Sequence, residues 1–187
     1  DSFWTDMGSS VVDHVREYKD VPVYHVTGWY DSWGSQVANL NYVELARAKK
    51  SPQRLIIGPW THGGQGQSFS GIAEFGSDAA IDLNELRLRW YDRWLKGLEN
   101  GVEKEAPVRI FVMGSGEPRK TSEGRLFVGG RWRDEREWPP KRAVDRGQTS
   151  ATDASGLKAP YLENPTVVGR DGGKRGLAAM LAWTRRW

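Results

Sequence analysis

Hydrophobic and polar positions follow two different periods over the first part of the chain. A β-branched and aromatic run over residues 21–29 predicts a strand that ends at Gly28. Over residues 35–50 the apolar positions recur at helical spacing, with cationic residues in the last turn. The short apolar run over residues 54–58, bounded by Pro and Gly, is typical of a strand buried on both faces. Together these segments predict a β-α-β unit.

A long loop and a second helix follow. Residues 59–77 are rich in Gly and Ser and predict a loop. Residues 80–96 predict a helix that Gly97 terminates. Its apolar positions form two rows, one of Leu83, Leu86, Trp90 and Trp94 and one of Leu88, Tyr91 and Leu95. The alternation of strands and helices predicts an α/β fold with a parallel sheet and flanking helices.

The pattern changes in the second half of the chain. Residues 108–113 alternate like a half-buried strand, and residues 125–132 predict another. Short strands with Gly and Pro punctuation and no helical period favour the start of a β-sandwich. We therefore expect residues 1–104 to be the C-terminal part of an α/β domain and residues 105–187 to be a partial β-sandwich domain.

Composition favours a folded, cysteine-free chain. Of its 187 residues 38% are hydrophobic, and the ten Trp, six Tyr and five Phe supply a large apolar area. The absence of Cys excludes disulfides and thiolate metal sites. The net charge is only +3, with acids interleaved among the bases, so no nucleic-acid partner is expected.

The sequence shows no targeting or membrane segment. No apolar run approaches the ~20 residues that a membrane span needs, and no signal peptide is visible. The chain begins at Asp1 rather than Met, so we expect a piece of a longer polypeptide. The compartment, cytoplasmic or secreted, stays open, and so does homo-oligomer formation.

Two titratable residues follow the ends of the first two predicted strands. Asp31 closes the segment Gly-Trp-Tyr-Asp, and His62 closes Gly-Pro-Trp-Thr-His. Functional groups collect at the carboxyl ends of parallel strands, and consecutive strands are usually neighbours. We therefore expect the two side chains to face each other, with the carboxylate fixing the imidazole tautomer for proton transfer from a serine. The alternatives are a turn or helix-capping aspartate and a surface histidine.

Five segments in order carry a resemblance to a known family. They are VPVYHVTGWYDSW, RLIIGPWTHGG, LRWYDRWLKG, VRIFVMG and GGRWRDEREWPP. Over residues 1–140 the chain resembles the CocE/NonD hydrolases, which include cocaine esterase, α-amino-acid ester hydrolases and glutaryl acylases and are similar to X-Pro dipeptidyl peptidases. The resemblance implies a serine hydrolase of esters or amides, with Asp31 as triad acid and His62 as triad base. It also implies an α/β-hydrolase sheet followed by a jelly-roll, galactose-binding-like sandwich.

The nucleophile of that family has no counterpart in the sequence. The family's serine lies in a G-x-S-x-G elbow upstream of the acid. The nearest match, residues 66–70, ends in Ser70 and follows His62, so we reject it. We expect a C-terminal fragment that lacks the serine and the oxyanion hole and is inactive by itself.

Other candidate residues bear on substrate and ligands. Trp29, Trp33 and Trp60 flank the two titratable residues, and the family's preference for bulky acyl groups implies that they line an acyl pocket. Core packing is the alternative. His14 and His25 lack the spacing of a metal pair, so no metal or cofactor is expected. The expected partner is a small-molecule ester or amide.

Two further functions stay open at this stage. The chain is either part of a serine hydrolase or a truncated, non-catalytic module that binds carbohydrate or another ligand through its Trp-rich sandwich. An X-Pro dipeptidyl peptidase is the third alternative, and it differs from the first in substrate.

Overall fold

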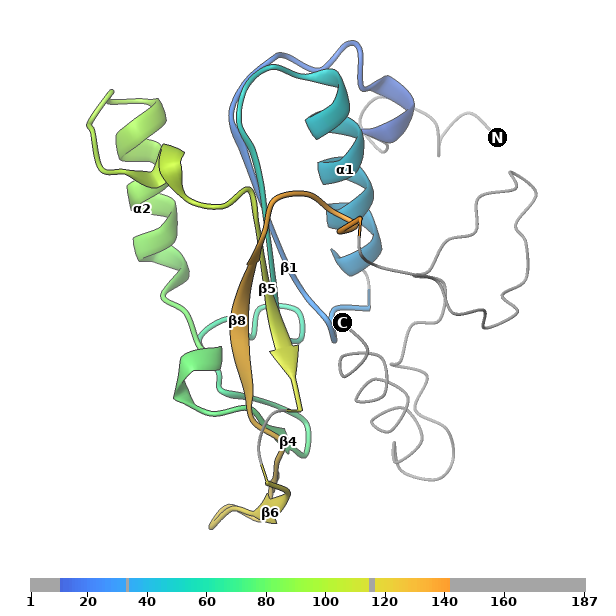
Figure 1. Ribbon diagram of the computed structural model, residues 1–187, viewed down its shortest axis with the longest axis vertical. Coiled ribbons are helices and arrows are strands. Elements are labelled where there is room, and N and C mark those ends of the chain that lie inside the picture. The colour runs from blue at the N-terminus through green and yellow to red at the C-terminus, as the bar shows by residue number, and fades with distance from the viewer. Residues whose placement is uncertain (1–10, 33, 115–116, 142–187) are drawn as a thin grey trace, which may run out of the picture.

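The structure has two four-stranded sheets, and the larger one, with six-residue strands, has a helix on each side of it (Figure 1). The computed structural model describes residues 11–32, 34–114 and 117–141. The elements, in chain order, are η2 (Val12–His14), β1 (Val23–Gly28), α1 (Gly34–Ala48), β2 (Gln53–Gly58), β3 (Phe69–Ser70), β4 (Ala73–Glu74), η3 (Ser77–Ala79), α2 (Leu83–Trp94), η4 (Val102–Lys104), β5 (Val108–Met113), β6 (Arg119–Lys120), β7 (Leu126–Phe127) and β8 (Gly130–Glu135).

The larger sheet has the strand order β1-β2-β5-β8. β1 and β2 are parallel neighbours, and β5 pairs in parallel with the other side of β2. All six residues of β2 are buried, as its continuous apolar run predicts for a central strand. The helix α1 connects β1 to β2, so the predicted β-α-β unit is confirmed.

Side chains on the two faces of the sheet pack into two separate hydrophobic clusters. Tyr42 of α1 packs against residues that include Leu55 and Ile57 of β2. Phe111 of β5 packs in a second cluster with Phe75 and the segment that follows it. Figure 1 shows α1 and α2 on opposite sides of the sheet. The α/β architecture predicted from the alternation of elements is therefore present.

The second helix is capped at its start and apolar on two sides. The Asp82 carboxylate accepts hydrogen bonds from the N–H groups of residues 84 and 85 at 2.8 and 3.1 Å. Trp90, from the first predicted apolar row, is buried. The second row lies largely in solvent, and Leu95 is 77% exposed. Gly97 has a φ of 74°, which suits a residue that ends a helix.

The strand predicted to open a β-sandwich lies instead in the α/β sheet. Val108 of β5 pairs with Leu55 of β2, and β8 then pairs antiparallel with β5. The alternating pattern was misleading because β5 is covered on both faces, with Phe111 and Met113 buried as well as Val108. The predicted boundary at residue 105 therefore falls before two strands of the α/β sheet, and a sandwich stays a prediction for residues 142–187, which lie outside the described part of the chain.

The long loop after β2 contributes β3 and β4 to a small second sheet, whose other two strands, β7 and β6, lie between β5 and β8. Its strands β3, β4, β7 and β6 are two residues each. Two-residue strands have no hydrophobic period, so the sequence predicted only a loop for the segment that contains β3 and β4. The sheet ties the segment after β2 to the one before β8, because β4 pairs with β7.

Candidate active site

Asp31 and His62 follow neighbouring strands at the same edge of the sheet. The paired stretch of β1 and β2 ends with Gly28 opposite Gly58. Asp31 comes three residues after the end of β1, and His62 comes four residues after the end of β2. The parallel pairing thus brings to one place two residues that are 31 positions apart in the chain.

Backbone hydrogen bonds continue between the two loops beyond the strands. The Trp29 N–H donates to the Gly58 carbonyl at 2.8 Å, and the Tyr30 N–H donates to the Trp60 carbonyl at 3.0 Å. The two loops therefore leave the sheet side by side, and each fixes the path of the other.

The carboxylate and the imidazole are in direct contact. His62 Nδ1 lies 3.2 Å from Asp31 Oδ2. The other carboxylate oxygen, Oδ1, accepts the Gly34 N–H at 2.8 Å at the start of α1. The Asp31 side chain is 8% exposed, whereas that of His62 is 74% exposed. A buried carboxylate fixed from one side and an imidazole open to solvent are what acid–base chemistry on an added group requires.

The alternative interpretation of Asp31, as a helix-capping residue, is compatible with its contact with His62. Its carboxylate does bond the backbone at the start of a helix, and the same group contacts His62 through its second oxygen. Gly34 was not identified from the sequence. Its place three residues after Asp31, where a capping side chain meets an N–H group, was the available signal.

His62 occupies a tight turn. The Gly64 N–H donates to the Thr61 carbonyl at 3.0 Å, which closes a turn with His62 at its second position. Gly63, at the third position, has a φ of 75°, in the left-handed region that favours glycine. The turn therefore presents the imidazole outward from the edge of the sheet.

Of the tryptophans expected to line an acyl pocket, Trp60 lies in the core. Trp60 is fully buried, and its indole N–H donates to the Ala79 carbonyl at 2.7 Å. Burial within this part of the chain can only increase when further segments are added, so Trp60 is a core residue and not a pocket wall. Trp29 donates its indole N–H to the Phe111 carbonyl at 2.9 Å. Trp33 lies outside the described residues.

Ser70, in the rejected elbow-like segment, has a structural role. Ser70 lies in β3, and its buried hydroxyl donates to the Pro59 carbonyl at 2.6 Å. Ser68 precedes the same strand, and neither serine lies between a strand and a helix. This placement differs from that of a nucleophile elbow, whose serine lies between a strand and a helix. No pattern in the sequence indicates the Ser70 contact, because hydroxyl-to-carbonyl bonds across a loop have no fixed spacing.

Neither a metal cluster nor a membrane helix is found in the part of the chain that the structure describes. There, no three His, Cys, Asp or Glu side chains come together as metal ligands. Over the same residues, neither helix combines the length and the apolar character that a membrane crossing requires.

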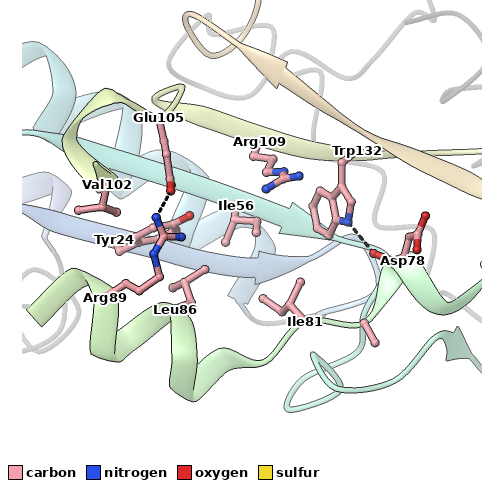
Figure 2. A pocket seen from close by; sticks show the side chains of 11 residues that line it. Tyr24, Ile56, Asp78, Ile81, Leu86, Arg89, Val102, Glu105, Arg109 and Trp132 are labelled. Atoms are coloured by element: carbon pink, nitrogen blue, oxygen red, sulfur yellow. Dashed lines mark hydrogen bonds and ion pairs between the residues drawn. The ribbon is translucent and has the colours of Figure 1, made fainter. Parts of the chain in front are cut away.

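A separate cavity lies between α2 and the sheet (Figure 2). Its volume is about 310 Å³, and its lining consists of Tyr24, Ile56, Asp78, Ala80, Ile81, Leu86, Arg89, Val102, Glu105, Arg109 and Trp132. Arg89 is paired with Glu105 at 2.6 Å. Neither Asp31 nor His62 lines this cavity, so it is distinct from the candidate active site.

Similar proteins were found by comparison with family models, with curated proteins and with solved structures. Residues 1–64 match the family model described as X-Pro dipeptidyl-peptidase (S15 family). The chain is 29% identical to cocaine esterase from Rhodococcus sp. (strain MB1 Bresler) over 121 residues, which are 63% of this chain and 18% of the relative. A solved structure, a CocE/NonD family hydrolase from Staphylococcus aureus, matches with a TM-score of 0.44 and 16% identity, over 67% of this chain and 18% of that one. The chain thus spans less than a fifth of the length of these proteins.

Proposed function

The chain is a relative of the CocE/NonD hydrolases, as its motifs predicted, and on this premise we propose that it supplies the acid and the base of a Ser-His-Asp triad. The complete protein would cleave carboxylic ester or amide bonds in small molecules through an acyl-enzyme. The serine and the oxyanion hole would come from a part of the protein outside this sequence.

The contact between His62 and Asp31 carries the proposal. A carboxylate at 3.2 Å from Nδ1 selects the tautomer with the proton on that nitrogen. Nε2 is then the nitrogen that accepts a proton. Because the His62 side chain is 74% exposed, a serine from another segment has room to approach it.

The reaction follows from these positions. The serine oxygen attacks the carbonyl carbon of the substrate while its proton passes to His62 Nε2. The imidazolium then protonates the leaving alcohol or amine, and the carbon–oxygen or carbon–nitrogen bond of the substrate breaks. Asp31 holds the ring and stabilises its positive charge in both steps. Water repeats the sequence on the acyl-enzyme and releases the acid.

The test is the loss of turnover on removal of the base. In the full-length protein, His62→Ala is expected to lower the rate of p-nitrophenyl acetate hydrolysis by about 10⁴-fold or more. His14→Ala, in the short helix η2, serves as the matched control and should keep the wild-type rate. A His62→Ala variant with the wild-type rate would contradict the proposal.

A second candidate rests on the family match over residues 1–64, whose description names an X-Pro dipeptidyl-peptidase. It requires the same Asp31 and His62 and differs in its substrate, a peptide with a free amino terminus and proline in second position. Parallel assays of an Xaa-Pro p-nitroanilide and p-nitrophenyl acetate separate the two. Faster turnover of the anilide, abolished by His62→Ala, would make the peptidase the better assignment.

A further inference from the structure

We propose that Trp60 and Ser70 are positioning residues for the proposed hydrolysis, because they fasten the base of the loop that carries His62. The inference rests on the proposed function and goes beyond it. It assigns a role in catalysis to two side chains that do not touch the imidazole in any contact described above.

The need for such residues follows from the exposure of His62. Its side chain is 74% exposed, so core packing does not hold the ring. The contact with Asp31 and the backbone from which the ring projects both influence its direction. That backbone is a turn in a glycine-rich stretch, which is flexible unless it is fixed at its base.

Trp60 fixes the chain two residues before His62. Its ring is fully buried, and its indole N–H donates to the carbonyl of Ala79 at 2.7 Å. Its own carbonyl accepts the Tyr30 N–H at 3.0 Å, in the loop that leads to Asp31. A single residue therefore joins the histidine loop to the aspartate loop and to the segment that precedes α2.

Ser70 fixes the neighbouring residue, Pro59, from the far end of the same loop. The Ser70 hydroxyl donates to the Pro59 carbonyl at 2.6 Å, and Ser70 is 6% exposed. The bond closes the loop between residues 59 and 70, with His62 inside it. Side chains at both ends of the loop thus hold two consecutive residues, Pro59 and Trp60.

The size of the expected effect follows from geometry. One neutral hydrogen bond contributes modestly to folding, so its loss should leave the protein folded. A misplacement of about 1 Å at a catalytic group lowers the rate by up to about 100-fold. Loss of either contact should therefore lower the turnover rate far more than it lowers stability.

The experiment uses the full-length protein and p-nitrophenyl acetate. Trp60→Phe keeps an aromatic ring in the core but removes the indole N–H together with the five-membered part of the ring, and Ser70→Ala removes the hydroxyl. Each is expected to lower kcat about tenfold with KM within about twofold of wild type. Ser70→Thr, which keeps a hydroxyl, should restore kcat to within about twofold.

Two matched controls remove the same chemical groups elsewhere. Trp90→Phe makes the same change to a buried indole of α2, outside the two loops that carry Asp31 and His62. Ser68→Ala deletes a hydroxyl two residues before Ser70. Both should keep the wild-type kcat. A loss in the controls equal to that in Trp60→Phe and Ser70→Ala would overturn the inference.

A double-mutant cycle separates positioning from a general structural effect. If Trp60 and Ser70 act by placing His62 against Asp31, their loss should cost less than about twofold in an Asp31→Asn background. The full tenfold loss in that background would overturn the inference. Should Trp60→Phe fail to fold, the Ser70 variants decide the question alone.

The outcome is distinct from that of the proposed function. If His62→Ala abolishes turnover while Trp60→Phe and Ser70→Ala keep the wild-type kcat, the triad stands and the positioning role fails. If His62→Ala keeps the wild-type rate, the proposed function fails and the positioning role fails with it.

Discussion

Gly28 and Trp60 approach so closely that a Cβ atom at position 28 would lie 2.0 Å from the Trp60 carbonyl oxygen. That separation is far below any real contact between a carbon and an oxygen atom. The contact joins the end of β1 to the loop after β2, at the place where the chain turns toward Asp31 and His62. Only a residue without a side chain allows the two backbones to meet there.

We predict that Gly28→Ala lowers both stability and activity. The methyl group must push the two loops apart, and overpacking of this kind costs about 1–3 kcal/mol of unfolding free energy. Urea unfolding followed by tryptophan fluorescence measures the loss. Gly66→Ala is the matched control, because a Cβ there would meet no atom within 4 Å. An equal loss in the two variants would show that the close approach is unimportant.

Gly34→Ala is expected to reduce turnover with little effect on folding. A Cβ at position 34 would lie 2.4 Å from Asp31 Oδ2, the oxygen that contacts His62. The carboxylate must therefore move, and if Asp31 is the triad acid, as we propose, its displacement should lower kcat about 10- to 100-fold. Ser35→Ala, at the next position of α1, should keep the wild-type kcat. Equal rates for the two variants would contradict the prediction.

Stability should decrease on mild acidification because of His25. Burial lowers its pKa below the ordinary 6.5, and a hydrogen bond with Gln53 only partly opposes this shift. The amide nitrogen of Gln53 donates to the Val21 carbonyl at 3.1 Å, which turns its oxygen toward His25 Nε2 at 3.3 Å. Between the lowered pKa and 6.5 the unfolded chain binds more protons than the folded one, so the unfolding free energy falls as the pH drops below about 6.5.

The measurement compares urea midpoints at pH 7.5 and 5.5. His25→Phe should show a smaller decrease than wild type, whatever its absolute stability, because it has no imidazole to protonate. A His25→Phe variant with an unchanged slope would assign the acid sensitivity to other groups.

Arg54 is expected to be one of the most sensitive positions for stability. It lies buried in the central strand β2, donates to the Ala106 carbonyl at 2.6 Å and also bonds the Val102 carbonyl. Arg54→Met leaves both carbonyls without this donor and should lower the unfolding free energy by about 3 kcal/mol. Arg54→Lys should lose less, since an ammonium group can still meet one carbonyl.

The control for that series is Arg47→Met. The Arg47 side chain is 71% exposed and pairs only at the surface with Glu44. Its loss should change the unfolding free energy by no more than about 0.5 kcal/mol, as is usual for an exposed ion pair. If Arg54→Met lowered the unfolding free energy as little as Arg47→Met, the hydrogen bonds from Arg54 would not stabilise the segment between α2 and β5.

The sequence was most informative where burial and period agree. The run around Ile56 predicted a strand covered on both faces, and β2 is buried throughout. Strand ends also located Asp31 and His62, because parallel strands deliver their following residues to one edge. The alternation around Ile110 misled, since it reports one regularly apolar face and says nothing of which sheet the strand joins.

The supporting contacts of the site were beyond sequence reasoning. Whether Trp60 faces a ligand or the core depends on segments about twenty residues away, such as the carbonyl of Ala79. The bond from Ser70 to Pro59 depends on how a glycine-rich loop closes on itself. Both are tertiary outcomes, and no local period encodes them.

The parallel pairing of β1 and β2 has a consequence for inheritance. Asp31 and His62 are separated by 31 positions, and only α1 and β2 lie between them in the chain. A short stretch of coding DNA thus specifies both partners together with the scaffold that aligns them. Recombination between related genes could exchange this stretch as one piece, so that the two side chains and the β-α-β unit that aligns them would be inherited together.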